Sequence, residues 1–119
     1  MTEIPFFDVV QHGDVTVLRL ADSAYFDVPE YEAMRDRLLD FVEREQPRRV
    51  VVDFSSVQYC STAVVASLLM VKNRVESQGG QIKLCGMNNT VRDAFRMLKL
   101  DGTLFDIHGV ETAAIEAFH

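Results

Sequence analysis

The sequence predicts an α/β fold in one domain over residues 1–119, with a mixed, mostly parallel sheet of about five strands and four helices. Three observations support this prediction. Short apolar, β-branched runs alternate with segments of helical periodicity. The first two runs are separated by only three residues, which indicates a hairpin. The 119 residues leave no room for a second large domain.

The first half of the chain predicts a hairpin, a helix and a buried strand. Strands over Phe6–Gln11 and Val15–Leu20 flank a connection that contains glycine. A helix follows from near Pro29, because apolar residues then recur at helical spacing until Pro47 ends it. The apolar run Val50–Val52 is typical of a parallel strand buried on both faces.

A second helix is expected from Ser61-Thr62 to about Ser77, before the turn at Gly79-Gly80. Its first half is apolar almost all round. Either a neighbouring helix covers this half, or it exposes a patch for a protein partner.

The second half of the chain completes the order β-β-α-β-α-β-α-β-α. A strand is expected over Ile82–Cys85 and a last strand over Leu104–Ile107. The spacing of Thr90 and Asp93 resembles a capping box and predicts the start of a third helix there. The expected apolar faces of the third and last helices are Val91, Ala94, Phe95 and Leu98, and Ala114, Ile115 and Phe118.

The charge balance argues against several classes of partner. The chain has 18 acidic and 12 basic residues, a formal net charge of −6, and Arg48-Arg49 is its only adjacent basic pair. Nucleic acids and anionic membrane surfaces both select clustered Lys and Arg, so neither is expected as a partner. No apolar stretch approaches the ~20 residues of a membrane span, and Met1–Asp8 lacks the pattern of a secretory signal. We therefore expect a cytoplasmic protein.

No residue pattern indicates an enzyme, a metal site or a cofactor. Cys60 and Cys85 are expected to be buried, reduced and unlinked, with a redox role as the alternative. The three histidines fall in the hairpin, in a strand-end loop and at the last residue, and no nucleophile-elbow or glycine-rich phosphate motif is present.

Function is expected at the carboxyl ends of the parallel strands, where open α/β sheets bind their ligands. The segments there are 53–62, 86–90 and 108–109. Ser61-Thr62 and Asn88-Asn89 should therefore lie at the same edge of the sheet. Asp53 is expected to cap the following turn through Ser55, with a catalytic role as the alternative.

The hydroxyl pair Ser61-Thr62 has two interpretations. One hydroxyl can be the N-cap of the second helix. Alternatively, one is a phosphorylation site, because a helix N-terminus stabilises a phosphate while a docked partner would meet new negative charge.

The order of elements and two sequence runs resemble the STAS domain of bacterial anti-sigma factor antagonists. The run Val50–Val57 is similar to the family's strand followed by D-[LF]-S-x-[VL], and Tyr59–Ala63 is similar to the segment that carries its regulatory hydroxyl. The segment from Leu84 to Phe105 is similar to the C-terminal half of that domain. Three features depart from the family pattern: Ser61 replaces an Asp, Val64 replaces a Gly, and the run Leu20–Ser23 lacks the family's Gly near the end of the second strand.

The resemblance implies a non-enzymatic STAS-like domain that binds an anti-sigma factor of the Ser/Thr kinase type and is switched by phosphorylation. By position, Thr62 is the first candidate for the regulatory hydroxyl and Ser61 the second. The implied partner-binding loop comprises Asp53, Ser55, Ser56, Tyr59 and Ala63. The alternatives are a scaffold or self-associating STAS module without a phosphoswitch, in which the chain could form a homodimer, and a module that binds a small ligand or nucleotide.

Overall fold

The computed structural model describes residues 6–21, 30–100, 102 and 104–119. The predicted helix start at Pro29 lies outside these residues. The elements are β1 (Phe7–His12), β2 (Val15–Leu20), α1 (Glu30–Glu45), β3 (Arg49–Asp53), α2 (Thr62–Ser77), β4 (Gln81–Cys85), α3 (Asn89–Met97), β5 (Ile107–His108) and α4 (Glu111–Glu116).

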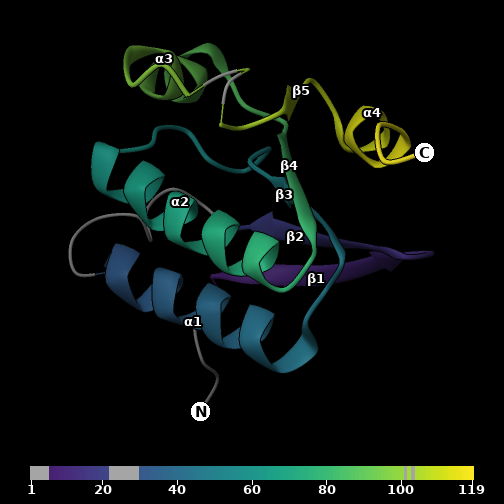
Figure 1. The fold of residues 1–119 in the computed structure, drawn as a ribbon. Helices are drawn as coiled ribbons and strands as arrows, with labels where there is room; N and C mark the ends of the chain where they lie inside the picture. The colour runs from purple at the N-terminus through teal and green to yellow at the C-terminus, as the bar shows by residue number, and fades with distance from the viewer. Residues whose placement is uncertain (1–5, 22–29, 101, 103) are drawn as a thin grey trace.

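The five strands form one sheet in the order β1-β2-β3-β4-β5. Only β1 is antiparallel to its neighbour, and the other three pairs are parallel. Figure 1 shows α1 and α2 side by side on one face of the sheet, with α4 on the other side. This arrangement confirms the predicted fold class.

Two apolar cores result from these layers, because successive strand residues point to opposite faces. The larger core lies under α1, α2 and α3 and includes Val50 and Val52 of β3. The smaller core lies under α4 and includes Val51 of the same strand. All three valines are fully buried, as the continuous apolar run predicted.

The apolar first half of α2 is mostly covered. Val64, Val65, Leu68 and Val71 are buried in the larger core. The interpretation of a covered helix is therefore confirmed for most of this half. A narrow stripe stays exposed, and Met70 on it is 48% accessible.

The predicted start and the predicted apolar face of α3 were both wrong in part. The N-cap is Asn88, whose Oδ1 accepts a hydrogen bond of 2.8 Å from the backbone N–H of Val91. Thr90 therefore lies inside the first turn, and the capping box does not form. Leu98 was expected on the apolar face, but it follows the last helical turn and is 44% exposed.

The last strand is shorter than predicted and shifted along the chain. The expected strand Leu104–Ile107 is replaced by β5, and Leu104 is half exposed. The reason is the buried ring of Phe105, which packs edge-on against Phe95 with centroids 5.5 Å apart. Its backbone N–H and C=O bond to Leu100 and Gly102 instead of to β4.

Both cysteines are buried and free, as predicted. Burial raises the pKa of the Cys60 and Cys85 thiols to about 12. Within the described ranges, no helix combines the length and apolarity needed to cross a membrane.

We expect both thiols to react slowly with a maleimide in the native protein, because the thiolate is the reactive form and is both rare and covered. Labelling at pH 8 should be at least about a hundredfold slower than in unfolding concentrations of guanidinium. Intact mass spectrometry over time measures this rate, and fast labelling of either thiol in the native state would contradict the expectation.

Candidate functional site

Two loops meet at the carboxyl edge of the sheet. β3 and β4 end side by side at Asp53 and Cys85, and residues 54–61 and 86–88 follow them. The Asn88 side chain joins the loops, because its Nδ2 donates to the carbonyl oxygen of Gln58 at 2.9 Å while its Oδ1 caps α3. The structure therefore confirms that the segments before α2 and α3 lie at one edge.

Asp53 shapes the first of these loops. Its Oδ1 accepts hydrogen bonds from the backbone N–H of Ser55 at 2.9 Å and from the Ser55 hydroxyl at 2.5 Å. Asp53 is only 7% exposed, and its carboxylate is bonded to the turn that follows β3. The predicted turn role of Asp53 is confirmed.

Gly86 makes room for this turn from the neighbouring strand end. Its φ is +75°, a conformation that disfavours side chains. A Cβ atom at this position would contact Asp53 Oδ1 and lie 2.6 Å from Ser55 Oγ. The sequence analysis included Gly86 in a strand-end segment but did not predict that it supports the loop.

The Asp53 side chain lies on the α4 face of the sheet, together with Glu111 and Arg19. Arg19 is the register partner of Asp53 and holds Glu111 at 2.6 and 3.0 Å through two guanidinium nitrogens. The pKa of Asp53 is raised, mainly by burial and next by the hydrogen bond with Glu111. The pKa of Glu111 is lowered to about 2, mainly by the hydrogen bond from Arg19 and next by the hydrogen bond with Asp53. No sequence signal indicated this contact, because it depends on strand register and on the docking of α4.

The start of α2 carries the two candidate hydroxyls. Ser61 is the N-cap, and its Oγ accepts a hydrogen bond of 3.3 Å from the backbone N–H of Val64. Thr62 is the first helical residue and is exposed. Among the described residues, its hydroxyl makes no hydrogen bond. The two candidates therefore differ: one hydroxyl is used locally and the other is not.

The remaining residues of the predicted loop divide by exposure. Ser55 and Ser56 are exposed, Tyr59 is 44% exposed, and Ala63 is half buried in the first turn of α2. Asp53 is buried on the α4 face, so it is not part of the same exposed surface. Across the part of the chain that the structure describes, no three His, Cys, Asp or Glu side chains gather as they would around a metal ion.

We expect Gly86→Ala to destabilise the protein more than Gly102→Ala. Both glycines have positive φ, so both changes carry the ~1–2 kcal/mol cost of a left-handed residue. Only the first adds a clash with the Asp53 turn, because none of the described residues comes within 4 Å of a Cβ atom at Gly102. Urea unfolding measures both losses, and equal losses would show that the turn does not need this space.

We expect the stability lost in Glu111→Gln to depend on pH. The pKa of Glu111 is lowered by Arg19, so its contribution is present above its ordinary pKa of 4.5 and is lost as the pH falls toward about 2. The variant should therefore be less stable than wild type at pH 7, and the difference should shrink between pH 5 and pH 2. Urea unfolding at several pH values measures this difference.

The matched control is the same substitution in an Arg19→Met background. Without the guanidinium, the pH dependence of the difference should be clearly smaller. An unchanged dependence would mean that Arg19 does not hold the Glu111 carboxylate.

Comparison with known proteins agrees with this geometry. A family model described as "Mlab, STAS domain" matches residues 7–109. A protein described as a candidate anti-sigma factor antagonist from Thermotoga maritima superposes with a TM-score of 0.83 at 16% identity, over 93% of this chain and 92% of that one. Unphosphorylated SpoIIAA gives 0.76 at 19% identity, over 94% and 95% of the two chains. Phosphorylated SpoIIAA from Bacillus gives 0.69 at 18%, over 95% and 99%. The extent of the family match shows that this chain belongs to the STAS domain family.

Proposed function

We propose that the chain is a non-enzymatic, cytoplasmic regulator of the anti-sigma factor antagonist type. It binds an anti-sigma factor of the Ser/Thr kinase type through the start of α2 and the preceding loop, including Ser55, Ser56 and Tyr59. Phosphorylation of Thr62 releases that partner.

One observation carries this proposal: Thr62 is exposed at the first position of α2, and its hydroxyl makes no hydrogen bond within the described residues. A kinase needs such a hydroxyl, because the nucleophile must reach a phosphoryl group unhindered. Ser61 fits less well, because its oxygen already caps the helix and a phosphate there would disturb the cap.

The local electrostatics would tolerate a phosphate on Thr62. The first backbone N–H groups of a helix have no partner within the helix, and the N-terminus carries partial positive charge. The first turn of α2 contains no acidic residue. A partner packed over this edge would meet a new charge of about −1.5 to −2 that must be desolvated.

The structural neighbours support the same function. SpoIIAA, which shares this fold, is an anti-sigma factor antagonist that has been solved in phosphorylated and unphosphorylated forms. For that protein, the fold accommodates a phosphate.

The proposal is tested first by locating the phosphate. The chain is incubated with ATP and each purified kinase-type anti-sigma factor of its source organism, and tandem mass spectrometry maps the product. Phosphate on Thr62 in wild type, and its loss in Thr62→Ala with Ser61 intact, is the expected result. Phosphate only at another residue, or none with any of these kinases, would contradict the proposal.

We expect Thr62→Glu to weaken binding to the cognate kinase-type partner by ~1–3 kcal/mol, the scale for a charge at a close-packed contact. Its melting temperature should stay near that of wild type, because the helix N-terminus favours a carboxylate. Isothermal titration calorimetry with the purified partner and ADP measures the affinity.

Two variants control for side effects. Thr62→Ala should bind like wild type, because it adds no charge. Ser61→Ala should lose ~1 kcal/mol of stability through the cap while keeping its binding. Equal affinity of Thr62→Glu and wild type would favour a scaffold that has no phosphoswitch.

A further inference from the structure

β1 leaves one edge of the sheet open. It is the first strand in the order, and among the described residues no strand pairs with its outer side. The carbonyl oxygen of Phe6, just before β1, accepts a hydrogen bond from the N–H of Ala21, just after β2. Because backbone groups alternate along a strand, those of Asp8, Val10 and His12 also face β2. The N–H and C=O groups of Phe7, Val9 and Gln11 therefore point outward at the open edge.

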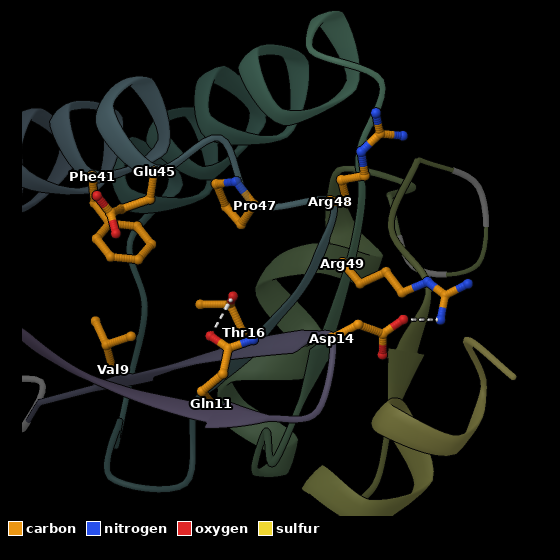
Figure 2. Close-up of a pocket in the computed structure, with 9 residues that line it drawn as sticks. All are labelled: Val9, Gln11, Asp14, Thr16, Phe41, Glu45, Pro47, Arg48 and Arg49. Carbon is orange, nitrogen blue, oxygen red and sulfur yellow. Dashed lines mark hydrogen bonds and ion pairs between the residues drawn. The ribbon is translucent and has the colours of Figure 1, made fainter.

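A trough runs beside this edge, between β1 and α1. It consists of two cavities of about 520 and 390 Å³ that share Val9 and Phe41. Figure 2 shows Phe41 and Glu45 of α1 on one side of the larger hollow, with Val9 and Gln11 of β1 on the other. Val9 faces the trough and is 47% exposed, so an apolar side chain of β1 is left uncovered next to backbone groups that no described strand pairs.

The charges around the trough are nearly balanced, unlike those of the whole chain. Four arginines and three carboxylates line the two cavities, whereas the chain carries a net charge of −6. The residues are Arg37, Arg44, Arg48, Arg49, Asp14, Asp40 and Glu45. A polyanion or a polycation would gain little electrostatic binding energy here. A surface with the same mixture of charges can be complementary to it.

We propose that a second copy of this chain occupies the open edge, with the two β1 strands paired antiparallel about a twofold axis near Val10. This axis is perpendicular to the sheet, so both copies present the same face on the same side. Val9 then pairs with Gln11 of the second copy through the outward backbone groups. Asp8 lies opposite His12 of the second copy, and this cross-strand contact occurs twice.

The same axis makes the flank of α1 self-complementary. Arg37, Phe41 and Glu45 are spaced four residues apart and line the trough together. Phe41 lines both cavities together with Val9 and packs edge-on against Phe7, with ring centroids 6.1 Å apart, so it lies in the middle of the trough. A twofold rotation reverses the helix direction, which brings Arg37 toward Glu45 of the second copy and the two Phe41 rings toward each other. The open strand edge and the charge pattern of α1 are therefore both compatible with a twofold pairing.

The first test is the oligomeric state of the full chain. Sedimentation equilibrium between about 1 μM and 1 mM covers the weak to moderate range of dissociation constants, and wild type should show a monomer–dimer equilibrium within it. Val9→Pro should raise the dissociation constant at least tenfold, because it removes an outward N–H while leaving the β1–β2 ladder intact. Met97→Asp, which removes an exposed apolar side chain on α3, should leave the constant unchanged.

A charge exchange on α1 tests the axis without touching the strand. Glu45→Arg alone places like charges opposite each other, and so does Arg37→Glu alone, so each variant should dimerise more weakly than wild type. An equimolar mixture of the two variants should dimerise again, because each copy then supplies the charge that the other needs. Circular dichroism confirms that the variants are folded.

Several results would overturn the proposal. Wild type that stays monomeric up to about 1 mM shows that no second copy binds this edge at a meaningful affinity. A dimer unaffected by folded Val9→Pro, or a mixture no tighter than its components, shows that another surface or axis is used. If Val9→Pro does not fold, the charge exchange decides alone. None of these results bears on Thr62, so the proposed phosphoswitch stands or falls separately.

Discussion

The hydrogen bonds from Ser55 to the carboxylate of Asp53 determine the direction in which the chain leaves β3. The following loop then reaches Gln58, where Asn88 fastens it to the segment after β4. Ser61 can therefore cap α2 at one defined place, and Thr62 is presented at the edge of the sheet. Gly86 is part of the same constraint, because any side chain there would displace the carboxylate. Asp53 thus acts as a positioning residue from a buried site rather than as a surface contact.

The two faces of the sheet contribute different interactions at this edge. On the face of α1 and α2, a continuous apolar core fixes the helix that presents Thr62. On the α4 face, Glu111 accepts hydrogen bonds from Arg19 and also shares a hydrogen bond with the carboxyl group of Asp53. A buried carboxyl group such as that of Asp53 needs polar neighbours. Strand register places Arg19 of β2 beside it, and the docking of α4 adds Glu111. The exposed hydroxyl and the polar cluster that supports its loop are therefore on opposite sides of one sheet.

Much of this could be predicted from residue patterns, but only where the cause was local. The bounds of β2 and α2 followed from apolar periodicity, from a Ser at the cap and from glycine at the C-terminus. The errors arose where tertiary contacts competed with local preferences. Asn88 caps α3 in place of Thr90 because its side chain also bonds to a neighbouring loop. The last strand begins later in the chain than expected because Phe105 is buried against Phe95. Arg19 and Glu111 gave no local signal, since 92 residues separate them along the chain.

The smaller core has a consequence for how the domain opens. One face of the sheet is closed by a helix of only six residues, whose sole fully buried apolar side chain among those described is Ala114. Partly buried Ile115 and Phe118 pack on the same core, Arg19 pairs with Glu111, and Lys83 lies over the ring of Phe118. Such a unit can detach as its own cooperative foldon at a lower free energy than global unfolding. Detachment would break the ion pair of Arg19 and expose Val15, Val17 and Val51 to solvent. The core under α1 and α2, next to the edge with Thr62, would stay intact.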